Sequence, residues 1–178
     1  KSFTDIALLG TTPNLLLVNP DKIKVKDFKE FVEYSKKQKD GVPFASTSIG
    51  GSTHLSGELL KMMTGLPLVH VPYRGTTPAL ADLLGGQVPA AFLDISAVLP
   101  HLKEGKLQAL GLTSKERLTV VPDVHTLDEE GVKGYEATTW IGFYGPANLP
   151  KDITDTLNKI AVESMHNQAN NEWITSNG

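Results

Sequence analysis

The sequence predicts an α/β fold in which helices cover both faces of a mostly parallel sheet. Two observations support this prediction. Short apolar runs alternate with longer amphipathic segments along most of the chain. The transitions between them fall at glycine, proline, asparagine or aspartate, which commonly end regular structure. Such alternation is typical of parallel sheets, because parallel strands need a long crossover that is usually a helix.

The composition describes an ordinary globular chain. It has 178 residues, of which 40% are hydrophobic and 21% charged, enough to bury a core in one or two domains. The net charge of -3 argues against a nucleic-acid partner, since phosphate neutralisation needs clustered Lys and Arg. No apolar run approaches the roughly 20 residues that span a bilayer, so we expect no membrane insertion. The absence of cysteine excludes disulfides and thiol chemistry.

Six strands are predicted from the apolar runs. The first run ends at Asn19-Pro20, a turn-forming pair, and the last is rich in threonine and aromatic residues. The predicted strands are 15–18, 42–46, 68–71, 88–93, 107–112 and 136–144.

Five helices are predicted between or after these strands. The first has Asp27 as N-cap with Glu30 three residues later, and it ends at Asp40-Gly41. The others extend to about 64, from 78 to 84, from 94 to 104, and from about 150 to 165. A small capping box is also predicted over residues 126–129.

Three polar turns follow three of the strands and lead into helices. In an open α/β sheet the carboxyl ends of the strands form the edge where ligands bind, so we expect these turns to meet there. The candidate ligand-binding residues of these turns are Ser46, Thr47, Ser48, Gly50, Gly51, Ser52, Thr53, Pro72, Tyr73, Arg74, Gly75, Thr76 and Asp94.

The chemistry of these turns favours a small anion. The first N–H groups of each helix have no partner within the helix, and the helix dipole adds positive potential. Glycine lets a ligand approach the backbone closely, and serine or threonine supplies an uncharged donor. The turn over residues 46–53, with the sequence STSIGGST, therefore suits an anion held mainly by neutral donors.

Structural roles remain open for several of these residues. Ser48, Ser52 or Thr53 could simply cap the following helix. Asp94 could bind an ammonium group of a ligand or cap its own helix.

The basic side chains near the turns have alternative roles as well. Arg74 could pair with a carboxylate or remain exposed at the rim of the cleft. We expect His54 to pack or hydrogen-bond within its helix, and His70, which lies among apolar residues of a strand, to be a satisfied core histidine.

Enzymatic readings find less support. The sequence contains no G-x-S-x-G elbow, no phosphate-binding loop and no metal-ligand spacing, and it places no two carboxylates together for acid–base work. We therefore expect no catalytic residue, no metal and no cofactor. A hydrolase that uses one of the serines stays as a rival reading.

A set of motifs in fixed order resembles a known family. The segments are SIGGSTHL at 48–55, HVPYRG at 70–75, DLLGGQV at 82–88, PHLKEGKL at 100–107, LTSKER at 112–117, PDV at 122–124 and TWIG at 139–142. Together they resemble the Bug-type substrate-binding proteins of bacterial tripartite tricarboxylate transporters, and the resemblance covers nearly the whole chain.

The resemblance implies a type II periplasmic binding protein-like fold, with one complete lobe and part of the second. Residues 17–110 would form the complete ligand-binding lobe, and residues 1–16 and 111–178 would belong to the other. Thr139 would approach the cleft from that other lobe. The resemblance also implies a fragment without the N-terminal part of lobe 1 and without the C-terminal tail.

The implied function is that of a non-enzymatic periplasmic receptor, made as a precursor with a signal peptide. It would capture a small mono-, di- or tricarboxylate and deliver it to the membrane permease subunits of the transporter. The alternative is the effector-binding domain of a LysR-like transcription regulator, which shares the two-lobed architecture.

Overall fold

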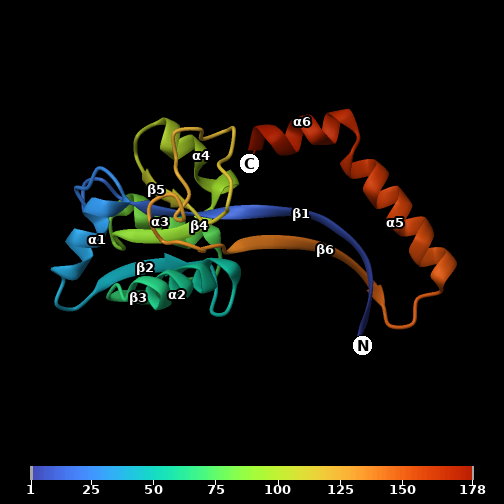
Figure 1. The fold of residues 1–178 in the computed structure, drawn as a ribbon, viewed down its shortest axis with the longest axis horizontal. Helices are drawn as coiled ribbons and strands as arrows, with labels where there is room; N and C mark the ends of the chain where they lie inside the picture. The colour runs from blue at the N-terminus through green and yellow to red at the C-terminus, as the bar shows by residue number, and fades with distance from the viewer. Residues whose placement is uncertain (1, 178) are drawn as a thin grey trace.

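The computed structural model describes residues 2–177, which form a layered α/β unit and a two-stranded ribbon that extends from it (Figure 1). The strands are β1 (Phe3–Val18), β2 (Val42–Ser46), β3 (Leu68–Pro72), β4 (Ala90–Asp94), β5 (Gln108–Leu112) and β6 (Thr138–Pro146). The helices are α1 (Phe28–Lys36), α2 (Ser52–Thr64), α3 (Thr76–Gly85), α4 (Ile95–Lys103), α5 (Lys151–Met165) and α6 (Gln168–Asn177).

The layered unit contains a five-stranded sheet in the order β3-β2-β4-β1-β5. Strand β2 pairs in parallel with β3 and β4, whereas β1 runs antiparallel to both β4 and β5. Strands β3, β2, β4 and β5 therefore share one direction and β1 alone opposes it. The prediction of a mostly parallel sheet is confirmed.

Strand β1 is much longer than the predicted strand over 15–18. Its last part, Asn14–Val18, pairs with β4 and β5, and the longer part before it, Phe3–Pro13, pairs with β6. This ribbon part was not predicted. It does contain an apolar run, Ile6 to Leu9, but only Ile6 and Pro13 are buried in it. The strand thus passes from the ribbon into the sheet between Pro13 and Asn14.

The helix boundaries agree with most of the sequence signals. Asp27 is the N-cap of α1, and its carboxylate accepts a 2.8 Å hydrogen bond from the Glu30 N–H. Helix α1 nevertheless stops at Lys36, before the predicted end at Asp40-Gly41. Helix α6 was not predicted, since its sequence has only a weak apolar face.

Alternating side chains of the central strands build two cores, one on each face of the sheet. On one face Leu16, Phe44 and Phe92 pack with residues of α1 and α2. On the other face Leu17 and Leu93 pack with residues of α3 and α4. This period of two is what a sheet with helices on both faces requires.

The segment between β5 and β6 packs against the layered unit before it reaches the ribbon. Leu127, Val132 and Tyr135 belong to the core on the α1/α2 face. The capping box over residues 126–129 forms with both reciprocal hydrogen bonds, but turns rather than a helix follow it. Just before β6, the Ala137 N–H donates a 2.9 Å hydrogen bond to the carbonyl of Thr113, which directly follows β5.

The ribbon of β1 and β6 carries α5, which contacts β1. The Asn158 amide donates a 2.6 Å hydrogen bond to the Ile6 carbonyl and fastens α5 to the ribbon. Helix α6 contacts α4 and α5 (Figure 1). Within residues 2–177, no helix combines the length and apolar character that crossing a membrane requires.

Replacement of Gly57 by Ala should loosen the packing of α2 on the sheet. A Cβ atom at Gly57 would lie 2.2 Å from the ring of Phe44, which is fully buried and cannot move aside. We expect Gly57→Ala to lower the free energy of unfolding by about 1–3 kcal/mol, as overpacked cores do. Urea denaturation measures this free energy. Gly10→Ala serves as the control, because a Cβ atom at Gly10 would meet nothing within 4 Å. Equal stabilities for the two variants would contradict this packing.

Candidate ligand-binding site

The parallel pairing of β3, β2 and β4 places the three predicted turns at one edge of the sheet. Ser46 at the end of β2 lies opposite Pro72 at the end of β3. Asp94 ends β4, the neighbour of β2 on the other side. Helices α2, α3 and α4 begin directly after these turns. The structure therefore brings together the three helix starts that the sequence singles out.

Two backbone hydrogen bonds join the first turn to the second. The Tyr73 N–H donates to the Ser46 carbonyl at 2.9 Å, and the Gly75 N–H donates to the Thr47 carbonyl at 2.8 Å. The turns over residues 46–53 and 72–76 consequently form one continuous polar surface beside the starts of α2 and α3.

None of the three helix starts is capped by a side chain. The N-cap residues are Gly51 for α2, Gly75 for α3 and Asp94 for α4, and none makes a side-chain capping hydrogen bond. The capping role considered for Ser48, Ser52 and Thr53 is therefore not the one they have. First-turn amides without a side-chain acceptor are available to an external anion.

The hydroxyl groups of the first turn divide into inner and outer ones. Ser46 and Thr53 are fully buried. The Thr53 hydroxyl oxygen accepts a 3.0 Å hydrogen bond from the Thr47 N–H and lies 3.0 Å from the Thr47 hydroxyl. Ser48 is exposed and Ser52 half-buried, so these two hydroxyls can reach a ligand while Ser46 and Thr53 shape the turn.

Glycine is required at the turns by backbone geometry. Gly75 has φ of 115° and ψ of 175°, a region that is essentially restricted to glycine. Gly50 has φ of 77°, in the left-handed region. A Cβ atom at Gly51 would lie 2.2 Å from the Ser48 hydroxyl oxygen, so the turn folds closely over this position.

Two histidines from separate elements stack beside the first turn. The rings of His54 on α2 and His70 on β3 have centroids 3.8 Å apart and planes inclined by 22°. The Gly50 N–H donates to Nδ1 of His54 at 2.9 Å. Nε2 of His70 lies 2.6 Å from the Ser46 hydroxyl oxygen. His70 is satisfied, as predicted, but it is only half-buried rather than part of the core.

The Ser46–His70 contact does not form a nucleophile. The Ser46 hydroxyl also donates a 3.2 Å hydrogen bond to the Ser48 carbonyl. A hydroxyl has one proton, so both contacts are made together only when His70 donates to Ser46. A general base must instead accept the hydroxyl proton, and Ser46 is fully buried.

The second turn supplies a cation at the surface. Arg74 is exposed, and its guanidinium forms no ion pair with any residue between 2 and 177. The neighbouring Tyr73 hydroxyl donates a 2.8 Å hydrogen bond to the Asp82 carboxylate within α3. Arg74 is thus available to a carboxylate, whereas the Tyr73 hydroxyl is engaged inside the protein.

Asp94 stands apart from the other candidate residues electrostatically. Its side chain is half-buried, and burial raises the pKa of its carboxyl group, partly offset by a hydrogen bond to its own backbone. Asp94 is also paired across the sheet with Asn14 of β1. A half-buried carboxyl with a raised pKa beside a helix start is a feature of functional sites.

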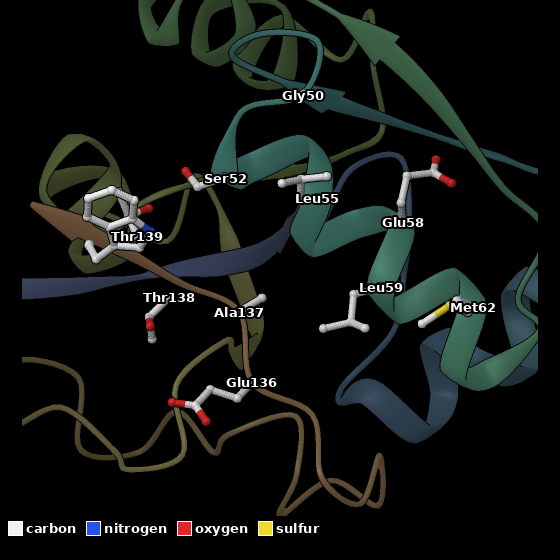
Figure 2. A pocket seen from close by; sticks show the side chains of 11 residues that line it. Gly50, Ser52, Leu55, Glu58, Leu59, Met62, Glu136, Ala137, Thr138 and Thr139 are labelled. Carbon is white, nitrogen blue, oxygen red and sulfur yellow. The ribbon is translucent and has the colours of Figure 1, made fainter. Parts of the chain in front are cut away.

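A cavity of about 740 Å³ extends from the first turn along one face of α2. Figure 2 shows Leu55 and Leu59 of α2 across from Ala137 and Thr138. The cavity is lined by Gly50, Ser52, Leu55, Glu58, Leu59, Met62, Glu136, Ala137, Thr138, Thr139 and Trp140.

Three predicted residues, Gly50, Ser52 and Thr139, share this cavity. The Thr139 hydroxyl oxygen is buried and has no hydrogen-bond partner among the described residues. The cavity therefore joins the layered unit to the first residues of β6 with a polar group left for a ligand or water.

Sequence reasoning missed a buried polar network beneath α2. The Asn14 N–H donates to the Thr113 hydroxyl at 2.8 Å, and the Asn14 amide group donates to the Ser56 hydroxyl at 3.1 Å. The Tyr135 hydroxyl donates to the Ser56 carbonyl at 2.8 Å. One signal was present in the sequence: Asn14 directly precedes the apolar run of the first predicted strand.

Substitution of Gly75 should disturb the second turn. Gly75→Ala puts a side chain on a backbone conformation reserved for glycine, which costs about 1–3 kcal/mol. We expect a lower free energy of unfolding in urea and a displaced start of α3. The matched control is Gly85→Ala at the end of α3, where φ is ordinary and a Cβ meets nothing within 4 Å. A Gly75 variant as stable as this control would refute the constraint.

Similar proteins were found among both sequences and structures. Protein BugT of Bordetella pertussis is 32% identical over 178 residues, which is 100% of this chain and 54% of that protein. The structure of R. palustris Rpa4515 with adipate has a TM-score of 0.92 at 28% identity, over 100% of this chain and 59% of that one. The structure of MatC from Rhodopseudomonas palustris with bound malate has a TM-score of 0.87 at 33% identity, over 99% and 60% of the two chains.

The chain spans about half the length of the curated relatives it matches first. These similarities confirm the resemblance predicted from the motifs, and they confirm the predicted α/β fold of the periplasmic binding protein type with a partial lobe. The family described as "Tripartite tricarboxylate transporter family receptor" matches residues 1–178. The chain therefore belongs to the family of tripartite tricarboxylate transporter receptors.

Proposed function

We propose that this protein is a periplasmic receptor that binds a small carboxylate and delivers it to the permease subunits of a tripartite tricarboxylate-type transporter. The observation that carries the proposal is the meeting of three helix starts without side-chain caps at one edge of the sheet. The protein works by binding and release, without catalysis.

The carboxylate binds at the starts of α2 and α3. First-turn amides there lack side-chain acceptors, and Ser48 and Ser52 add hydroxyl donors. Arg74 supplies a charge that no residue of the described chain neutralises. Hydrogen bonds from charged groups to carboxylates are shorter and stronger than neutral ones, so Arg74 contributes most per contact.

Asp94 has a different role from the other two helix starts. An ionised carboxylate at the start of α4 repels a second anion, so the carboxylate of the ligand stays with α2 and α3. Asp94 instead binds an ammonium group or another hydrogen-bond donor of the ligand. Its partial burial beside the turns supports this role.

The ligands named for the similar structures support a carboxylate. Rpa4515 was solved with adipate and MatC with malate, and both are dicarboxylates. Family membership favours a receptor over the effector domain of a LysR-like regulator. The burial of Ser46 and the direction of its hydrogen bonds count against the hydrolase reading.

Closure between two lobes would hold the bound ligand. The proposed division gives residues 17–110 to the larger lobe and residues 1–16 and 111–178 to the other. Residues 14–16 and the segment up to Ala137 nevertheless pack on the layered unit, and Thr139 reaches the cavity from the ribbon. A ligand that contacts both lobes stabilises the closed state by its differential affinity. The passage of β1 from ribbon to sheet at Asn14 supports a connection of this kind.

Calorimetry of the whole protein with benzoate, malate, adipate and citrate tests the receptor function. We expect binding of at least one acid. Removal of the guanidinium in Arg74→Ala should weaken it by about tenfold or more, because a hydrogen bond to a charged group is worth about 1.5–3 kcal/mol. Ser48→Ala should cost about 1 kcal/mol for its neutral hydrogen bond.

Lys103→Ala is the matched control, since it also removes an exposed cation, at the far end of α4. It should leave binding unchanged. The proposal is overturned if none of the four acids binds, or if Arg74→Ala and Ser48→Ala both bind like the unmodified protein.

Asp94→Asn should stabilise the protein at neutral pH while it alters binding. The pKa of Asp94 is raised in the folded protein above its ordinary value of 3.8, so folding favours the protonated form. The stability that the Asp94 carboxyl contributes is fully present below pH 3.8, and it is lost as the pH rises through the pKa of this carboxyl in the folded protein. Thermal unfolding from pH 3 to 7 should show the stability difference between variant and parent growing as the pH rises, because the other carboxyls titrate alike in both. Identical pH profiles would contradict the burial of this carboxyl.

A further inference from the structure

We propose that His54 is a positioning residue, whose neutral imidazole holds the turn over residues 48–51 in its binding conformation, so that carboxylate affinity falls in acid. The proposal rests on the proposed function, because the turn belongs to the site described above. It assigns a role to a side chain that we expected, from the sequence, to pack or hydrogen-bond within its own helix.

The turn has few internal constraints apart from His54. Ser48 and Gly50 are exposed, and Gly50 has the left-handed φ of 77° that lets its N–H face α2. That N–H donates to Nδ1 of His54 at 2.9 Å. The spacing of four residues lets a side chain in the first turn of a helix reach back to the preceding loop. His54 therefore determines where the amide of Gly50 points.

The hydrogen bond defines the protonation state of His54. Nδ1 accepts a proton from Gly50, so it carries none itself and the ring proton resides on Nε2. A proton added to Nδ1 would place two donors against each other. The hydrogen bond is thus compatible only with the neutral ring, and a proton on Nδ1 breaks it.

Stacking on His70 fixes the ring of His54 in this orientation. The centroids are 3.8 Å apart, and His70 is itself held by the 2.6 Å contact with Ser46 and by the ring of Phe44 at 5.3 Å. Burial lowers the pKa of His70, and the neighbouring His54 lowers it further, while Glu58 opposes both. Two stacked imidazoles also disfavour a state in which both are charged.

The charged groups around the pair do not cancel this effect. Glu58 on α2 approaches Nε2 of His54 at 4.0 Å, but its other oxygen faces Lys61 at 3.8 Å. Glu136, across the cavity, pairs with Lys115 at 3.0 Å. Glu58 attracts a protonated His54 through Nε2, on the side of the ring opposite Gly50. Protonation therefore weakens the contact with the turn and strengthens the one with the helix.

Two substitutions separate the hydrogen bond from the stacked ring. His54→Asn keeps an acceptor near the position of Nδ1 but cannot be charged. His54→Phe keeps a stacked ring but has no acceptor. His166→Gln removes a histidine at the C-cap of α5 and serves as the matched control.

Affinities are measured by calorimetry at pH 5 and pH 8 with the four acids named above. In the parent protein and in His166→Gln we expect binding about two- to tenfold weaker at pH 5, the equivalent of one lost hydrogen bond. His54→Asn should lose the part of this change that depends on His54, so its affinity should fall less between pH 8 and pH 5 than that of the parent. His54→Phe should bind weakly at both.

A second measurement needs no ligand. The Gly50 amide resonance of ¹⁵N-labelled whole protein should shift with pH in step with the His54 ring signals, and should stay constant in His54→Asn. If no acid binds while Gly50 follows His54, the receptor function is lost and the positioning role stands. A Gly50 resonance indifferent to His54, or a His54→Phe variant with the affinities and pH dependence of the parent, would overturn the inference.

Discussion

Parallel pairing of β2 with β3 and β4 is the constraint on which the site depends. Parallel strands end at the same edge, and each must be followed by a crossover helix. Their helices consequently begin together, with unpaired amides directed at one region. The glycines at the starts of α2 and α3 leave those amides without side-chain acceptors. The binding surface is therefore a result of topology, and few specialised side chains are needed to build it.

Much of the fold was predictable because burial leaves a pattern in the sequence. Strand β2 and the end of α2 lie where the apolar run over 42–46 and the Gly65 stop placed them. The ribbon part of β1 was not predicted, because only Ile6 and Pro13 are buried in it and its apolar residues follow one another without alternation. A strand without a buried face has no apolar alternation, and only its pairing with β6 identifies it.

The site was predictable to the extent that it is local in sequence. A turn such as 46–53 can be recognised in the sequence by its adjacent glycines and hydroxyl residues. Contacts between segments that are distant in sequence produce no such local pattern. The stack of His54 on His70 and the bond from Asn14 to Ser56 depend on which strand lies beside which helix. The periodicity of apolar residues indicates which face of a segment packs on the core, but it does not indicate which residues of another segment that face contacts.

Thr113 has a mechanical consequence for the connection between sheet and ribbon. Its backbone and hydroxyl bond to Asn14, where β1 enters the sheet, and its carbonyl accepts from Ala137, where the chain leaves toward β6. Both connecting segments are thus fastened to the same residue. Thr113 therefore couples the position of β1 at its entry into the sheet to the position of the chain at its exit toward β6.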